Sequence, residues 1–175
     1  APTSRLERKD VNGESAYHLL LLAKDIEGYK NLLKLSSSSY IDGFYRKPRI
    51  DKEILRQYSK GLIAMSACLK GDINETLRSD RYDEAKRIAY EYVDMFGKEN
   101  FFLELQEHGL EEDAICMPLV NRLAAETGIE VTPSNAKLCD FADIVILAVK
   151  PQVIDAVAEE IAPKLGKAKL TVSVA

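Results

Sequence analysis

Apolar residues gather in short runs along this chain, and stretches with a helical period separate those runs. Runs of four to seven residues bounded by polar positions are typical of strands in a sheet. The alternation of strands and helices predicts an α/β fold with a mostly parallel sheet and flanking helices. We expect the strands at residues 17–23, 62–67, 101–105, 129–132, 144–149 and 170–174.

Capping residues indicate where the first helices begin and end. Asp25 precedes a helix that we expect to run from Ile26 to about residue 35, where the four serines at 36–39 end it. Asp51 precedes a second helix, through residue 58. A third helix follows Asp80 and stops at Gly97. Its apolar face has a helical period and consists of Ala85, Ile88, Ala89, Tyr92, Val93 and Phe96.

Three further helices are expected in the second half of the chain. One runs over residues 112–127 and ends at Gly128, and another covers residues 135–141. The last begins with Pro151, since proline suits the first position of a helix. Its inward positions are Val153, Ile154, Val157 and Ile161.

Composition and charge exclude several classes of protein. The chain has 175 residues, 46% hydrophobic and 30% charged, which is typical of a folded globular protein. Its net charge is −4 with no basic stripe, so we expect no direct binding of nucleic acid. No apolar run approaches the roughly 20 residues of a membrane helix, so we expect no membrane insertion. Ala1 is not a natural translation start, so we expect a true beginning upstream.

Three cysteines, Cys68, Cys116 and Cys139, are widely spaced and form no CxxC pair. This spacing argues against a disulfide framework and a zinc knuckle. A reducing, cytoplasmic location fits best.

Three stretches of the first 131 residues carry a resemblance to a known family: NGESAYHLLLLAKDIEGYKNLLKL (12–35), GFYRKPRIDKEILRQYSKGLIAMSACLKGDI (43–73) and NFFLELQEHGLEED (100–113). Residues 1–131 resemble the polymerase-and-histidinol-phosphatase (PHP) domain at the front of the bacterial replicative polymerase, the DNA polymerase III alpha subunit. The resemblance implies part of a PHP-type barrel. The polymerase palm of that family lies far beyond this domain and has no counterpart here.

The last part of the chain resembles an unrelated family. The segments TPSNAKLCDFADIVILAVKPQVIDAVAEEIAPKLG (132–166) and LTVSVA are similar to the NADP-binding domain of pyrroline-5-carboxylate reductase. Residues 132–175 would then form a Rossmann-like βα fragment. The junction near Val131-Thr132-Pro133 has no polar linker and falls within a predicted strand, so we expect one continuous sheet across it in a chimera-like chain.

The PHP resemblance implies a metal site, because that family binds a cluster of divalent ions through many His and acidic ligands. His18 aligns with a strand histidine that the family uses as a ligand, and Cys68 falls at a strand end where related domains place another. The only other histidine is His108, so the family's HxH motif is absent. Taken without the resemblance, His18 is a structural residue at a strand edge and Cys68 a small buried hydrophobe. We assign no role to His108.

The reductase resemblance implies a nucleotide site, although the GxGxxG turn that would hold the pyrophosphate is absent. It places Ser134 and Asn135 near the adenosine end of NADP. It also places the turn Ala148, Val149, Lys150 and Pro151 against the cofactor. Without the resemblance, Lys150-Pro151 is a solvated turn between a strand and a helix.

We therefore expect a chimeric or truncated α/β protein with no catalytic residues and no cofactor. Two alternatives stay open: a residual metal-dependent phosphoesterase that uses His18 and Cys68, and a weak NADP-binding module. Exposed sheet edges predict that the chain forms a homo-oligomer.

Overall fold

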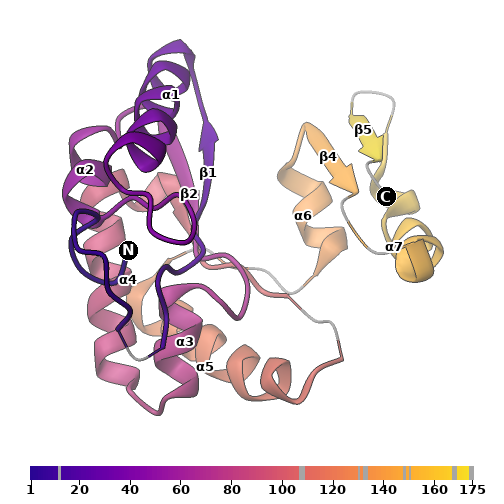
Figure 1. The fold of residues 1–175 in the computed structure, drawn as a ribbon. Coiled ribbons are helices and arrows are strands. Elements are labelled where there is room, and N and C mark those ends of the chain that lie inside the picture. Colours follow the sequence, from indigo (N-terminus) through magenta and orange to yellow (C-terminus); the bar gives the residue numbers. More distant parts are fainter. Residues whose placement is uncertain are drawn as a thin grey trace. The chain divides into compact units, whose positions relative to one another are not determined.

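The computed structural model describes residues 1–11, 13–106, 109–129, 131, 134–147, 149, 151–166 and 169–173. Its backbone contacts divide the chain into two compact units, Ala1–Val131 and Thr132–Ala175 (Figure 1). Among the described residues, no helix is long and apolar enough to cross a membrane.

Unit 1 contains a mixed three-stranded sheet in the order β1-β2-β3. The strands are β1 (Leu20–Ala23), β2 (Leu62–Met65) and β3 (Phe101–Phe102). β1 pairs antiparallel with β2, and β2 pairs parallel with β3. The mostly parallel sheet that we expected is therefore not what unit 1 shows. Two helices connect β1 to β2, so this crossover is not the single-helix unit that makes two strands parallel.

The helices of unit 1 cover this sheet and one another. They are α1 (Ile26–Ile41), α2 (Lys52–Gln57), α3 (Asp72–Arg78), α4 (Tyr82–Phe96), the 3₁₀ turn η1 (Lys98–Asn100) and α5 (Glu111–Thr127). The predicted caps are confirmed: Asp25 accepts a 2.7 Å bond from the Gly28 N–H, and Asp51 accepts a 3.1 Å bond from the Ile54 N–H. The predicted stops at Gly97 and Gly128 are also confirmed, with φ angles of 81° and 67°.

α1 is longer than predicted, because the serine run continues the helix through Ile41. The Ser39 hydroxyl donates a 2.6 Å bond to the Ser36 carbonyl, so its polar group is satisfied inside the helix. Ser39 is buried, and Asp42 closes the helix with an N–H bond to the Ser38 carbonyl. Weak helix propensity is overridden here by tertiary packing.

α3 was not predicted, and α4 begins later than predicted. Gly71 has an extended backbone just before α3, and a Cβ on it would lie 2.1 Å from the Ser66 carbonyl oxygen. Asp80 takes a left-handed φ of 56°, which ends α3 and moves the start of α4 to Tyr82. α3 then packs against α4 and α5.

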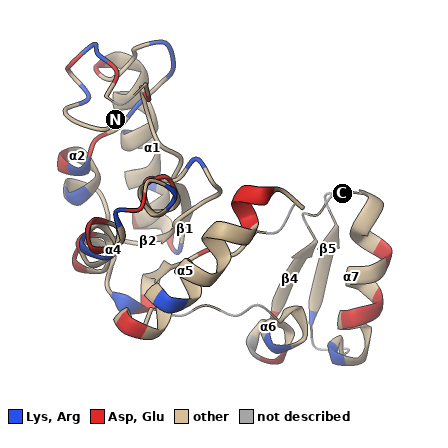
Figure 2. Cartoon of the chain, turned by 90° about the horizontal axis from the view of Figure 1, so that it is seen from below, with Lys and Arg blue, Asp and Glu red and all other residues tan. Residues whose placement is uncertain are grey.

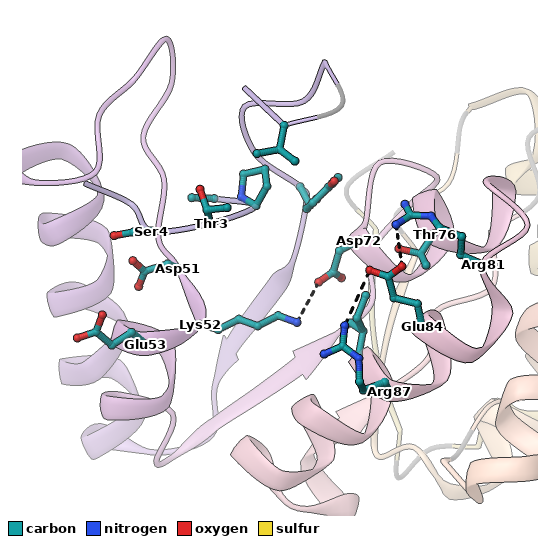
Figure 3. A pocket seen from close by; sticks show the side chains of 15 residues that line it. Thr3, Ser4, Asp51, Lys52, Glu53, Asp72, Thr76, Arg81, Glu84 and Arg87 are labelled. Atoms are coloured by element: carbon teal, nitrogen blue, oxygen red, sulfur yellow. Dashed lines mark hydrogen bonds and ion pairs between the residues drawn. The ribbon is translucent and has the colours of Figure 1, made fainter. Parts of the chain in front are cut away.

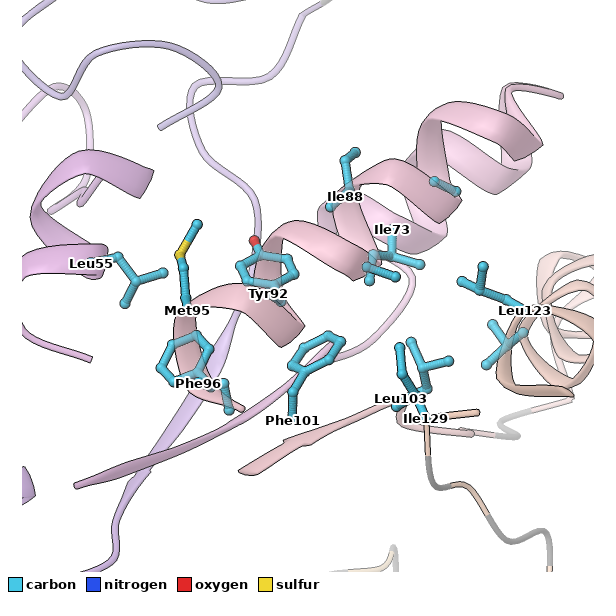
Figure 4. Packing of buried hydrophobic residues seen from close by; sticks show 14 of the residues in the cluster. Leu55, Ile73, Ile88, Tyr92, Met95, Phe96, Phe101, Leu103, Leu123 and Ile129 are labelled. Carbon is cyan, nitrogen blue, oxygen red and sulfur yellow. The ribbon is translucent and has the colours of Figure 1, made fainter. Parts of the chain in front are cut away.

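The core of unit 1 lies between α4, the sheet and α5 (Figure 4). The Tyr92 and Phe101 rings stack with centroids 5.1 Å apart. The predicted apolar face of α4 is confirmed except at Val93, which is half-buried, while Met95 is buried in addition. Burial of this set supplies the main stabilisation of the unit. Its largest fully buried members are Leu35, Leu62, Ile73, Leu77, Phe101 and Leu123.

Charged residues of both signs are interspersed on the helices, as Figure 2 shows for α2, α4 and α5. Lys52 of α2 contacts Glu91 of α4 at 2.6 Å, and Lys86 of α4 contacts Glu126 of α5 at 2.8 Å. Arg122 also bonds Glu126, and the two cations hold the pKa of this carboxyl down at about 2. Such surface pairs orient neighbouring helices more than they stabilise them.

Unit 2 is a small α/β layer. It contains α6 (Asn135–Phe141), β4 (Ile144–Leu147), the turn η2 (Pro151–Val153), α7 (Ile154–Ile161), the turn η3 (Ala162–Lys164) and β5 (Leu170–Ser173). β4 and β5 pair in parallel. Cys139, Val145 and Ile161 form its buried centre.

Two predictions for the last helix are wrong. Pro151 begins a 3₁₀ turn and not the α-helix itself, and Val153 is 48% exposed where we expected it inward. The α-helix starts only at Ile154, which rotates the inward face relative to the predicted one.

The described strands form two sheets, one in each unit. Ile129 and Val131 belong to no strand, so the predicted strand at 129–132 is wrong at these two positions. Glu130, Thr132 and Pro133 lie outside the described residues. Continuity of one sheet across the junction stays a prediction.

Candidate functional site

The two predicted metal ligands lie side by side in unit 1. His18 precedes β1 and Cys68 follows β2, and antiparallel pairing brings the start of β1 to the end of β2. The His18 N–H donates a 2.8 Å bond to the Lys70 carbonyl, which fixes the backbone at this point. Cys68 Sγ is 3.4 Å from His18 Nδ1. A thiol and an imidazole at this distance can share a proton or bind one soft metal ion.

The loop after β2 holds Cys68 in place. Ala67 takes a φ of 61°, a left-handed conformation that turns the chain away from the strand. The Asn74 side-chain amide donates to the carbonyls of Cys68 at 3.1 Å and of Ala67 at 3.5 Å. The Gly71 N–H also donates to the Cys68 carbonyl, at 2.7 Å. The cysteine therefore sits on a loop with several internal bonds.

A cavity of about 640 Å³ opens beside this pair. Its wall is mostly apolar. The residues in this wall whose side chains can bind a metal ion are His18, Cys68 and Glu104. His18 is exposed and Cys68 is half-buried. In the part of the chain that the structure describes, no group of three or more His, Cys, Asp or Glu side chains is placed to hold a metal. Glu107 and His108 lie outside that part.

A second cavity, of about 520 Å³, lies between the first residues, α2, α3 and α4 (Figure 3). Asp72 of α3 faces it and is 6% exposed. Its Oδ2 accepts a 2.7 Å bond from the Tyr92 hydroxyl and lies 3.8 Å from Lys52 Nζ. Burial raises the pKa of Asp72, although the bond from Tyr92 and the charge of Lys52 oppose the rise. Burial, and next the Asp72 charge, raise the pKa of Tyr92 well above its usual value.

Asp51 and Arg49 fix the segment that leads into α2. Asp51 accepts bonds from the Arg5 backbone N–H at 2.7 Å and from the Arg5 guanidinium at 3.1 Å. Arg49 is 3% exposed and donates to the carbonyls of Gly43, Ser15, Arg5 and Glu7. These donations satisfy a buried guanidinium without a carboxylate.

Sequence reasoning missed Asp72, Arg49 and Tyr92 as polar centres. Asp72 directly follows Gly71 and so occupies a helix start, which is the one signal that could have found it. The Tyr92 hydroxyl was not foreseen, since an apolar periodicity does not show where a phenol points. Arg49 has no local pattern at all.

Two of the predicted nucleotide-binding residues, Ser134 and Asn135, make bonds within unit 2, and the role of the set in binding stays a prediction. The Ser134 side chain accepts a 3.2 Å bond from the Lys137 N–H and so caps α6. Asn135 Nδ2 donates a 2.8 Å bond to Glu160 Oε2, which ties α6 to α7. Val149 is half-buried after β4, and Pro151 is exposed at the start of η2. Ala148 and Lys150 lie outside the described residues.

Comparison with known proteins finds matches for both parts of the chain. The family model described as "NADP oxidoreductase coenzyme F420-dependent" matches residues 117–175. This match supports the predicted resemblance of the last segment to a Rossmann-like NADP oxidoreductase domain, while the narrower resemblance to pyrroline-5-carboxylate reductase stays a prediction. The match begins at Met117, inside α5 of unit 1.

About three quarters of the chain is similar to DNA polymerase III alpha subunits. The subunit of Treponema pallidum is 44% identical over 136 residues, which are 77% of this chain and 12% of the relative. The subunit of Thermus aquaticus is 42% identical over 137 residues, 77% of this chain and 11% of the relative. That of Deinococcus radiodurans is 42% identical over 134 residues, 76% of this chain and 10% of the relative.

This chain therefore spans about a tenth of the length of the curated relatives that it matches. The PHP domain family model matches residues 5–108, more than half of the 175 residues. The resemblance predicted for the first part is confirmed, and the chain belongs to the PHP domain family.

Proposed function

We propose that this chain is a PHP module of the DNA polymerase III alpha type, joined to an NADP-oxidoreductase-like segment, and that its role is structural and not catalytic. The observation that carries the proposal is that the buried carboxylates of unit 1 hold parts of its fold together. Asp51, Asp72 and Asp113 each accept a hydrogen bond from the fold around them.

Each of these bonds joins elements that must stay together. Asp51 links the first residues to α2, and Asp72 links α3 to α4 through Tyr92. Asp113 accepts a 3.1 Å bond from the Leu110 N–H and so caps α5. Metal-assisted hydrolysis needs several carboxylates and imidazoles that face one open site. Carboxylates that accept bonds from a helix start or a buried phenol instead stabilise the folded state.

The test uses the full chain, loaded with Mn²⁺ or Zn²⁺ and then desalted. Elemental analysis is expected to find fewer than two ions for each chain, and a generic phosphoester substrate is expected to stay intact. Hydrolysis that depends on the metal and is lost in His18→Ala would establish an enzyme and end the structural proposal.

A second candidate function rests on the 3.4 Å distance between Cys68 Sγ and His18 Nδ1. This pair supports the binding of one soft divalent ion, because thiolate and imidazole are the ligands that Zn²⁺ and Cd²⁺ prefer. Both side chains reach the cavity of about 640 Å³, so an ion can enter. Water molecules would complete the coordination.

Cd²⁺ gives a thiolate charge-transfer band in the ultraviolet, which tests this second candidate. The band is expected in the unsubstituted chain and in Cys116→Ser, a matched control because Cys116 is buried and does not line this cavity. It is expected to vanish in Cys68→Ser and to weaken in His18→Ala. An equal band in all four proteins would exclude the site.

For unit 2, we infer a weak NADP affinity from the family match over residues 117–175. Asn135 and the turn that ends at Pro151 are the proposed contacts. Titration with NADPH tests this, and the affinity should fall in Asn135→Ala. No binding at millimolar NADPH would remove the proposal.

A homo-oligomer through sheet edges also stays a proposal. β1 is the terminal strand of the three-stranded sheet, and Leu20 and Leu22 on it are 43% and 47% exposed. An uncovered edge of this kind favours pairing with another strand. Sedimentation over a range of concentrations tests it, and a monomer at all of them would contradict it.

A further inference from the structure

A small cavity lies between the end of β3, α3 and α5, next to the loop that carries Cys68. Its volume is about 10 Å³. This is about the space that one water molecule occupies by the same measure. Asn74 of α3 and Glu104, two residues after β3, both line it. The cavity is therefore formed entirely by unit 1.

The orientation of the Asn74 amide follows from its partners. Nδ2 donates to the carbonyl oxygens of Cys68 and Ala67, which can only accept. The reversed amide would set an oxygen against two oxygens, so Oδ1 must be the atom on the other side. Asn74 is 5% exposed, and its Oδ1 has no hydrogen-bond partner among the described residues.

Glu104 presents a second acceptor of the same kind. Its Oε1 accepts a bond from Gln106 Nε2, and its backbone N–H donates a 2.9 Å bond to Ser66 Oγ. These bonds fix the side chain and leave Oε2, which is sealed from solvent and has no partner within the described ranges. A buried acceptor without a donor destabilises the folded state. Two such acceptors on one cavity would destabilise it further.

We propose that this cavity binds one water molecule, which donates one proton to Asn74 Oδ1 and the other to Glu104 Oε2. Water is the smallest molecule that supplies two donors, and buried waters typically bond to polar groups that would otherwise be unsatisfied. Asp113 is a second carboxylate that lines the cavity, so a small cation is the competing occupant, and the last experiment below distinguishes it from water. The water completes the bonding of Asn74, whose amide holds the Cys68 loop.

Magnetic relaxation dispersion, which counts long-lived internal waters, tests the proposal on the full chain. Glu104→Met removes one acceptor with little change in volume, and the count is expected to fall by one. Glu111→Met is the matched control, because Glu111 is exposed, and its count should equal that of the unsubstituted chain. An unchanged count in folded Glu104→Met would overturn the proposal.

A measurement on the unsubstituted chain separates water from a cation and does not depend on the folding of a variant. The NMR signals of the Asn74 side-chain amide are followed while Na⁺ or NH₄⁺ replaces tetramethylammonium at constant ionic strength. A bound water predicts no saturable shift. A saturable shift with one small cation would overturn the water and assign the site to that ion.

Discussion

Tyr92 and Asp72 form a buried pair in which the phenolic hydroxyl donates a 2.7 Å bond to carboxylate Oδ2. The pair joins the middle of α4 to the first residue of α3. Lys52 of α2 lies 3.8 Å from the same oxygen and 5.1 Å from the centre of the Tyr92 ring. Three helices of unit 1 therefore meet at one carboxylate.

Removing the hydroxyl should destabilise unit 1 without changing its shape. Tyr92→Phe keeps the stacked ring but leaves Asp72 with one donor fewer, which we expect to lower the free energy of unfolding by about 1–3 kcal/mol. Urea unfolding at neutral pH measures the change. Tyr90→Phe is the matched control, because Tyr90 is 47% exposed, and it should unfold like the unsubstituted chain. Equal stability of the two variants would contradict the role of the pair.

The raised pKa of Asp72 predicts a particular pH dependence. The folded state binds the carboxyl proton more tightly than the unfolded state, so this residue contributes stability at low pH and loses it as the pH rises through its folded pKa. As the pH rises, the unsubstituted chain should therefore lose stability relative to Asp72→Asn. Urea midpoints on both sides of the raised pKa measure this.

Asp51 provides the opposite case. Burial alone would raise its pKa, but the N–H groups of Arg5 and Ile54 and the charge of Arg5 hold the pKa below its usual value. Its contribution to stability is therefore present above the unfolded pKa and lost as the pH falls through the folded one. The difference between the unsubstituted chain and Asp51→Asn should shrink on acidification. If the stability difference changed with pH in the same direction for Asp51→Asn and Asp72→Asn, the opposite pKa shifts of the two residues would be contradicted.

A close backbone approach between α1 and the turn before β2 gives a fourth prediction. A Cβ on Gly28 would lie 1.8 Å from the Gly61 carbonyl oxygen, which belongs to backbone and cannot move aside alone. Gly28→Ala should therefore destabilise unit 1 by at least about 1–3 kcal/mol, as expected for overpacking. Ser37→Ala, on the exposed side of the same helix, is the control. Thermal unfolding compares them, and a neutral Gly28→Ala would contradict the packing of α1.

The features of the fold that could be predicted are those set by residues close in sequence, such as helix caps and helix ends. Asp25, Asp51, Gly97 and Gly128 act through their own backbone neighbourhood, and each was assigned from the sequence alone. The direction of β1 relative to β2 was not predictable, because it depends on how two intervening helices pack. The continuation of α1 through the serines depends in the same way on the burial of Ser39.

The candidate site shows the same limit. His18 and Cys68 were named from a family resemblance, and the structure brings them together. The polar centre at Asp72, Lys52 and Tyr92 was missed, because its members come from three helices and share no spacing. Ser134 and Asn135 were predicted as ligand contacts, which stays a prediction, and their bonds that cap α6 and join it to α7 were not foreseen. A family resemblance can therefore identify candidate site residues, but their hydrogen-bond partners become known only from the packed structure.

The two units should differ in stability. Among the described residues, the apolar centre of unit 2 has three buried members, Cys139, Val145 and Ile161, and that of unit 1 has nineteen. Ile161→Ala removes one of the three, so we expect it to broaden or shift the NMR signals of β4 and β5. The signals of β1 to β3 should stay unchanged. Concerted loss of signals from both units would show that they fold as one.

The measurement that tests the central claim most directly is the metal content of the full chain together with its phosphoesterase activity. We predict fewer than two Mn²⁺ or Zn²⁺ ions for each chain after loading and desalting, and no metal-dependent hydrolysis. Two or more tightly held ions, with turnover that disappears in His18→Ala and persists in Cys116→Ser, would contradict the structural role and establish an active PHP site.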